Sequence, residues 1–167
     1  MREVLDCNNK IKEVIVLFKI TKSGITSVFF RKSDKKTEDK EDKFVVSNLF
    51  LDGRYDRIII PNTVRYVWTD ISYEEPNANL NHITEISIGT SVEDLSGCVF
   101  MTAGIKEVII PTSVKKIGQW AFASCPNLET VIFNGTPEII GRGAFINCPK
   151  LKNIKIPEGS LCEGIII

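Results

Sequence analysis

The side chains best suited to chemistry in this chain are five cysteines and a single histidine, His82. One histidine cannot supply a two-histidine metal site, and any serine or cysteine nucleophile would need that same imidazole as its base. The odd number of cysteines and their wide spacing predict neither a disulfide framework nor a structural zinc site. We therefore expect no catalytic residue, no metal and no cofactor.

A second group with chemical potential follows Trp68, in a stretch that reads Thr69-Asp-Ile-Ser-Tyr-Glu-Glu-Pro-Asn-Ala-Asn-Leu-Asn-His82. Its carboxylate and amide oxygens suit calcium, but their order does not match a calcium loop with its turn glycine. Insertions in repeat arrays often form functional loops. We predict an insertion loop with four candidate contact residues, Trp68, Tyr73, Glu74 and Glu75, and local packing is the alternative for the two aromatic ones.

The composition of the chain limits the classes of partner and the cellular compartments that we expect. The chain has 167 residues, with 21 Lys and Arg against 21 Asp and Glu, and 43% of its residues are hydrophobic. This balance fits a soluble globular chain and predicts neither nucleic-acid nor anionic-membrane binding. No apolar run approaches the ~18 residues of a membrane span, and the charged N-terminus lacks the apolar core of a secretion signal.

The elements that must position these residues belong to a repeat. The segments IKEVIIP, LETVIF and LKNIKIP begin at Ile105, Leu128 and Leu151, 23 residues apart each time. The segments between them share Ile, Gly, Ala, Phe, Cys, Pro and Leu in matching register. Looser copies begin at Ile83 and Tyr55. About five strand units therefore run from Tyr55 to the C-terminus.

Each unit predicts a short strand, a turn and a compact helical or irregular return. Proline directly after the strand stops it, and Gly118 and Gly141 permit the turn. Phe100, Phe122 and Phe145 recur at steps of 22 and 23 residues, which predicts a buried phenylalanine spine. Because one unit cannot bury these residues alone, stacked coils must supply neighbours above and below. The expected product is a parallel solenoid.

The pattern LxxVxIPxSVxxIGxxAFxxCxxL, as it stands in Ile105 to Leu128, resembles the BspA-like (Treponema-type) leucine-rich repeat. The resemblance is specific from Ile105 to Pro157, weaker from Tyr55 to Gly104 and absent from residues 1–54. It implies an α/β repeat solenoid, a right-handed β-α superhelix with a parallel concave sheet. It also implies a non-catalytic binding or adhesion role, usually in secreted or surface proteins of host-associated microbes. Two departures, at Leu95 to Phe100 and at Trp68, predict irregular early coils.

The segments outside the clear repeats predict a cap at the N-terminus and either a completed core or an exposed edge at the C-terminus. Residues 11–30 are β-rich and broken at Thr21 to Gly24, which predicts a hairpin. We expect residues 1–54 to form an N-terminal cap with a charged loop at 33–43, and residues 55–167 to form the solenoid. Because Ile11 to Val16 matches a repeat strand, a degenerate first coil is the alternative to the hairpin cap. The chain ends in three isoleucines, which either complete the core or form an exposed edge.

The predicted binding surface is the outward side of the strands. One outward column, Ile59, Ser87, Ile109, Ile132 and Lys155, is mostly apolar, and exposed apolar surface commonly marks a partner site. The alternative is that β-branched residues simply suit strands. A second row, with Arg57, Glu85 and Glu107 as its charged members, could select a ligand by charge. The alternating column Lys106, Glu129 and Lys152 is expected to fix register.

These patterns lead to a protein- or peptide-binding module whose resemblance favours an extracellular or cell-surface location. The alternative is a structural segment that associates with itself through its C-terminal end. Cys125 and Cys148 hold the same place in adjacent units, and we expect them to be reduced core thiols rather than a disulfide. An enzyme with its site in residues 1–54 is the weakest hypothesis, since that segment has no histidine and no glycine-rich phosphate loop.

Overall fold

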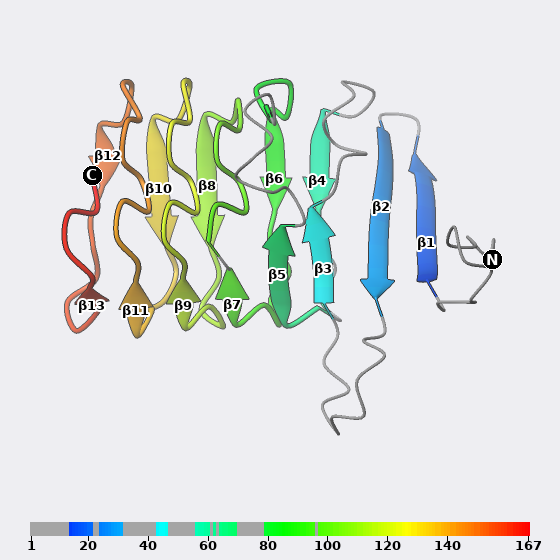
Figure 1. Ribbon diagram of the computed structural model, residues 1–167, viewed down its shortest axis with the longest axis horizontal. Helices are drawn as coiled ribbons and strands as arrows, with labels where there is room; N and C mark the ends of the chain where they lie inside the picture. The colour runs from blue at the N-terminus through cyan, green and yellow to red at the C-terminus, as the bar shows by residue number, and fades with distance from the viewer. Residues whose placement is uncertain are drawn as a thin grey trace, which may run out of the picture.

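A computed structural model describes the backbone of residues 14–21, 24–31, 43–46, 56–60, 62, 64–69, 79–95 and 97–167. Successive coils of the chain stack along one axis, with the N-terminal strands at one end and the C-terminus at the other (Figure 1). Each complete coil has three sides: a strand, a second strand and a turn segment. This stacking confirms the predicted repeat fold with parallel sheets.

The first strand of each coil contributes to a parallel face that we call sheet A. Within it, β4 pairs with β6, and β10 pairs with both β8 and β12. Figure 1 shows all five strands side by side. Their bounds are β4 Arg57–Ile59, β6 Glu85–Ser87, β8 Glu107–Ile110, β10 Thr130–Phe133 and β12 Asn153–Ile154.

The second strand of each coil contributes to a continuous six-stranded parallel sheet, sheet B, in the order β13-β11-β9-β7-β5-β3. Because β3 pairs with β5, the parallel stack extends N-terminal to residue 55. The bounds are β3 Lys43–Val46, β5 Tyr66–Thr69, β7 Asp94–Leu95, β9 Lys116–Ile117, β11 Ile139–Ile140 and β13 Leu161–Cys162.

The third side of each coil is the irregular return, not the helical one, of the two that the sequence left open. Within the described residues no helix is present, and turn segments connect sheet B back to sheet A. The backbone N–H of Phe100 donates to Ala121 O in the next coil at 2.8 Å, and Phe122 N–H donates to Ala144 O at 2.8 Å. A helix would direct these N–H groups back along its own chain instead.

Backbone conformation explains why the helix does not form. Left-handed φ values recur at one position of successive coils, Cys98 (59°), Trp120 (57°) and Gly143 (64°). A second set recurs four residues later, with φ values of 66°, 55° and 57° at Thr102, Ser124 and Asn147. A left-handed residue every fourth position interrupts a right-handed helix. The turn geometry persists at Cys98, where the sequence departs from the repeat.

The buried row of Phe100, Phe122 and Phe145 runs through the centre of the stack. All three side chains are fully buried. The ring centroids of Phe100 and Phe122 are 5.3 Å apart, and those of Phe122 and Phe145 are 5.5 Å apart with nearly parallel planes. The predicted phenylalanine spine is confirmed.

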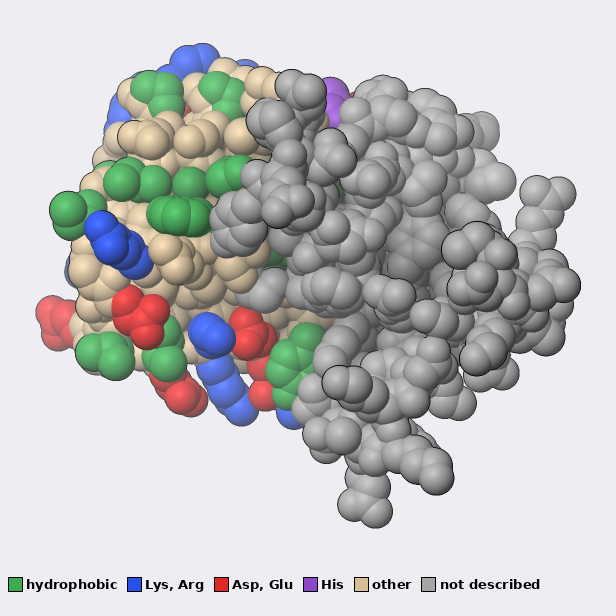
Figure 2. Space-filling view, in the orientation of Figure 1, with side chains coloured by type: hydrophobic (Ala, Val, Ile, Leu, Met, Phe, Trp, Pro, Cys, Tyr) green, Lys and Arg blue, Asp and Glu red, His purple; other side chains and the backbone are tan. Residues whose placement is uncertain are grey.

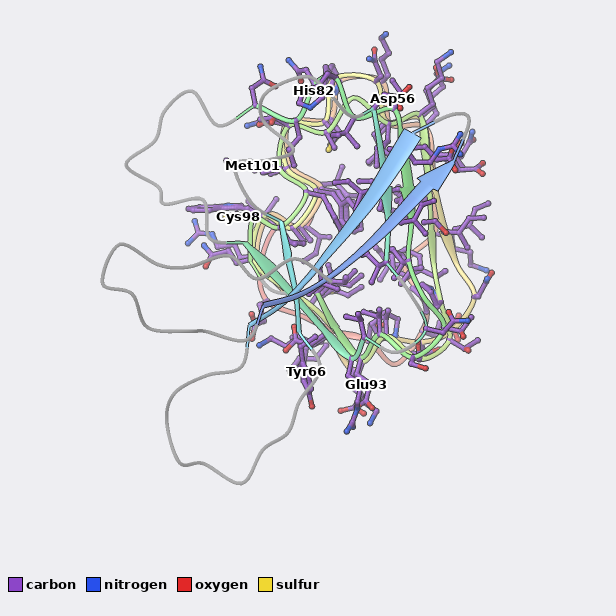
Figure 3. The ribbon with its side chains drawn as sticks, turned by 90° about the vertical axis from the view of Figure 1, so that its right-hand side faces the viewer. Asp56, Tyr66, His82, Glu93, Cys98 and Met101 are labelled. Atoms are coloured by element: carbon purple, nitrogen blue, oxygen red, sulfur yellow. The ribbon has the colours of Figure 1, made fainter. Side chains whose placement is uncertain are left out.

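The predicted hairpin is also found at the N-terminal end. Strand β1 (Val14–Thr21) pairs antiparallel with β2 (Gly24–Arg31), with Thr21 opposite Gly24. The antiparallel pairing differs from that of a degenerate first coil. Figure 3, which looks onto this end, shows the hairpin lying across the coils. Of the charged segment 33–43, only Lys43, the first residue of β3, is among the described residues.

Candidate functional site

Ile109 and Ile132 are neighbours on the outward side of sheet A. They are paired directly in the β8–β10 register, and their side chains are 47% and 39% exposed. Val108 and Ile110, which flank Ile109, are buried because side chains alternate across a strand. The same strands therefore hold the core with one set of side chains and present apolar surface with the other.

The rest of the predicted isoleucine column is less continuous. Ile59 is half-buried and lies opposite the exposed Ser87 in the β4–β6 pair. Lys155 is exposed just beyond β12. The structure thus brings Ile109 and Ile132 together as an apolar pair, which we call the isoleucine pair, and separates it from Ile59 by Ser87.

The predicted charged row is partly neutralised. Arg57 Nη2 lies 2.8 Å from Glu85 Oε2 across β4 and β6. The next strand presents Glu107, which is exposed and lies opposite Thr130. Asn153 Nδ2 donates to Thr130 Oγ1 at 3.2 Å. The isoleucine pair is therefore bordered by one carboxylate and two linked neutral polar side chains.

The column expected to fix register contains one ion pair in the last coils. Lys152 Nζ lies 3.7 Å from Glu129 Oε2, and both side chains are exposed. Exposed pairs of this kind contribute only ~0 to 1 kcal/mol.

The insertion loop lies largely outside the described part of the chain. Trp68 is placed only as a backbone position of β5, opposite Val45 of β3. Tyr73, Glu74 and Glu75 are not among the described residues, so their predicted role in contact stays a prediction.

A charged cluster on the sheet B side was not singled out from the sequence. Both Arg65 Nη2, at 2.6 Å, and Arg65 Nε, at 2.9 Å, donate to Glu93 Oε1, and Lys115 Nζ donates to Glu93 Oε2 at 3.0 Å. Figure 3 shows Tyr66 and Glu93 at this side of the coil, and Figure 2 shows acidic and basic side chains along the same edge. The three residues occupy equivalent positions of successive coils, and that spacing was the signal that could have identified them.

Two neighbouring carboxyl groups in this region have opposite pKa shifts. Hydrogen bonds from Lys115 and Arg65 hold the pKa of Glu93 below its ordinary value. Burial raises the pKa of Asp94, and the Lys116 ammonium, 3.7 Å away, only partly offsets that effect. One carboxylate oxygen of Asp94 is buried without a hydrogen-bond partner, which accounts for the larger effect of burial.

In the described coils, Cys125, Cys148 and Cys162 are free thiols. Cys125 is buried, Cys98 and Cys148 are half-buried and Cys162 is exposed. The described residues contain no group of three or more His, Cys, Asp and Glu side chains placed to hold a metal ion. They also contain no helix of the length and apolarity that crossing a membrane requires.

Parallel coils of 22 or 23 residues, stacked over a buried phenylalanine row, define a leucine-rich repeat solenoid. The profile of the BspA type leucine rich repeat region matches this chain in six copies over residues 43–162. The chain therefore belongs to the BspA-type leucine-rich repeat family. No curated protein matches it.

The same class of fold is found in a solved structure of a bacterial protein. A leucine rich cell surface protein from Faecalibacterium prausnitzii A2-165 is 20% identical, with a TM-score of 0.54 over 84% of this chain and 38% of that one. A leucine-rich repeat protein from Bacteroides ovatus ATCC 8483 is 24% identical, with a TM-score of 0.45 over 87% of this chain and 46% of that one. The chain thus spans less than half the length of either protein.

Proposed function

We propose that this chain is a non-catalytic module that binds a protein or peptide on sheet A, centred on the isoleucine pair. The observation that carries the proposal is the exposure of Ile109 and Ile132, which lie in direct register on the outward face of sheet A. Covering the exposed half of each side chain would contribute roughly 1 kcal/mol, since complete burial of an isoleucine is worth ~1.5 to 3 kcal/mol. The pair forms the apolar centre that a binding surface needs.

The polar residues around the pair support the same proposal. Glu107, Thr130 and Asn153 border it on one side, and Lys155 lies at its end. An apolar centre with a polar border is the usual composition of a protein interface. The Arg57–Glu85 ion pair extends the border towards the N-terminal coils. Charged members of such a border contribute to partner choice more than to affinity.

The location that we propose is the microbial cell surface, in an adhesion role. It is supported by membership of the BspA-type family and by the similarity to a protein named as a leucine rich cell surface protein. The hairpin β1–β2 acts in this proposal as a cap over the N-terminal coils, because the open end of a solenoid exposes its core and its strand edges.

The test requires a defined ligand, which can be selected from a displayed library of short peptides with the full chain as bait. Binding of the selected peptide is then measured by calorimetry with the double variant Ile109→Asp/Ile132→Asp. We expect a loss of affinity of about 100-fold or more, because two apolar contacts are removed and two charges must be desolvated. Circular dichroism should be unchanged, since both side chains point outward.

The matched control is the double variant Ile165→Asp/Ile167→Asp, which places the same two charges at exposed isoleucines outside sheet A. Peptide binding should be unaffected by this control. Undiminished binding to the double variant would contradict the proposed surface. Failure of the library to yield any peptide whose binding depends on the pair would count against the proposal as well.

A second candidate function is self-association through the C-terminal end. Three apolar side chains there are strongly exposed: Leu161 at 62%, Ile165 at 67% and Ile167 at 58%. In the same coil Leu151 and Ile154 are only partly buried, whereas Leu128 and Val131, their equivalents one coil earlier, are buried. We propose that a second copy of the chain covers this apolar end, because exposed patches of this kind favour association.

A further inference from the structure

Cys125 and Cys148 occupy the same position of neighbouring coils. Each precedes a proline and follows a residue in the left-handed conformation, Ser124 or Asn147. The strands that follow them, β10 and β12, are paired with Thr130 opposite Asn153, which is the same 23-residue offset as that between the cysteines. Neighbouring strands lie ~4.8 Å apart, within the ~4.4 to 6.8 Å between α-carbons that a disulfide spans.

The two thiols are close enough to influence each other's ionisation. A hydrogen bond between the thiols, followed by burial, raises the pKa of Cys125, and the same hydrogen bond lowers the pKa of Cys148. Each sulfur also lies within weak hydrogen-bonding distance of a carbonyl oxygen. Cys125 Sγ lies 3.5 Å from Phe100 O, and Cys148 Sγ lies 3.2 Å from Phe122 O. Rotation of the side chains out of these bonds is a small loss, because S–H is a weak donor.

The environments of the two thiols differ, which suits one thiol to react first with an oxidant and the other to attack the oxidised sulfur. Cys148 is half-buried, whereas Cys125 is completely buried. The less buried thiol, Cys148, is also the one whose pKa is lowered, and the thiolate is the reactive form. Ala103 holds the equivalent position in the coil before Cys125, so no cysteine continues the column there.

We propose that Cys125 and Cys148 form a disulfide between neighbouring coils when the folded protein meets hydrogen peroxide. The Cys148 thiolate attacks one peroxide oxygen, the O–O bond breaks and the leaving hydroxide takes up a proton as water. Cys148 is then a sulfenic acid. The Cys125 sulfur, losing its proton, attacks the Cys148 sulfur, and the S–O bond breaks to release a second water. The two thiols lose two electrons in total, and these reduce the peroxide.

The disulfide would join coils immediately before β10 and β12, the strands that carry Ile132 and Asn153. It closes a loop of the chain from residue 125 to residue 148. A closed loop restricts the unfolded chain, so the oxidised protein should resist unfolding more than the reduced protein does. The site thus responds to peroxide by reinforcing the C-terminal coils, independently of any partner on sheet A.

The test uses the full chain carrying Cys7→Ser, Cys98→Ser and Cys162→Ser, treated with hydrogen peroxide under native conditions. The expected product has lost about 2 Da, the two hydrogen atoms removed when a disulfide forms. Peptide mapping should join the fragment with Cys125 to the fragment with Cys148, and the midpoint of thermal unfolding should rise. Reduction with dithiothreitol should reverse both changes.

Single variants separate the roles. Cys125→Ala should accumulate a sulfenic acid at Cys148 that dimedone traps, and Cys148→Ala should leave Cys125 unmodified. If a substitution at a buried cysteine prevents folding, the unsubstituted chain is treated with peroxide and mapped in the same way. It should give the same Cys125–Cys148 cross-link. Formation of the Cys125–Cys148 bond only after denaturation would overturn the proposal, as would direct conversion of Cys148 to sulfinic acid with Cys125 still reduced.

Discussion

Close contacts between equivalent residues of successive coils determine which side chains each position accepts. A Cβ atom placed on Gly104 would lie 2.0 Å from Asn81 O, and one on Gly141 would lie 2.5 Å from Gln119 N. Both obstacles are backbone atoms of the preceding coil, so neither can move aside without opening the stack. Phe122 shows the complementary case, because a large side chain fills the centre between two similar rings.

Phe122→Ala is the most informative single substitution in this core. It removes a fully buried ring that contacts Phe100 on one side and Phe145 on the other. We expect the free energy of unfolding to fall by about 3 to 5 kcal/mol, the usual loss for a buried Phe changed to Ala. Urea denaturation measures it. Phe133→Ala is the matched control and should be milder, since Phe133 is half-buried. Equal losses for the two variants would show that the row does not dominate the core.

At the scale of the element, the strand pattern was predictable and the turn segments were not. Alternation around Val108 and Ile110 identified the buried side of β8 and the exposed position of Ile109. The 23-residue repeat identified the partner of each strand. In the turn segments, Trp120 and Ser124 adopt left-handed φ values although neither is a glycine. Hydrogen bonds to the next coil stabilise that geometry, and a pattern confined to one repeat does not contain them.

The charged edge of sheet B should give the protein a measurable pH dependence. Because its folded-state pKa is lowered, Glu93 stabilises the fold above its ordinary pKa of 4.5, and this contribution is lost as the pH falls through the folded value. Glu93→Gln should therefore reduce stability at neutral pH and make little difference in strong acid. Urea denaturation at several pH values measures the difference between variant and parent.

Asp94→Asn should show the opposite sign. The folded-state pKa of Asp94 is raised above its ordinary value of 3.8, so its favourable contribution is present at low pH and is lost as the pH rises through the folded value. The asparagine variant cannot ionise. Its free energy of unfolding should therefore increase relative to that of the parent as the pH rises through the folded-state pKa of Asp94. Parallel profiles for Glu93→Gln and Asp94→Asn would contradict the assignment of opposite shifts to these neighbours.

At the scale of the whole molecule, each coil obtains its core from the coils on either side. Leu128 is buried because the coil that begins with Leu151 covers it, and Leu151 itself is only partly buried. The N-terminal end carries the hairpin β1–β2 (Figure 1), whereas the C-terminal end presents exposed isoleucines. In the proposed self-association, the C-terminal coil supplies the contact surface.

Self-association through the C-terminal end leads to a specific expectation for the double variant Ile165→Asp/Ile167→Asp. Sedimentation of the parent chain should show a monomer–dimer equilibrium at high protein concentration, and the variant should sediment as a monomer, because the added carboxylates must lose their hydration at the contact. Both substituted side chains are more than half exposed, so the fold should survive. The double variant Ile109→Asp/Ile132→Asp, an equal change of charge on sheet A, should leave the equilibrium unaltered. A parent chain that remains monomeric at every concentration tested would eliminate this mode of assembly and leave partner binding on sheet A as the proposed function.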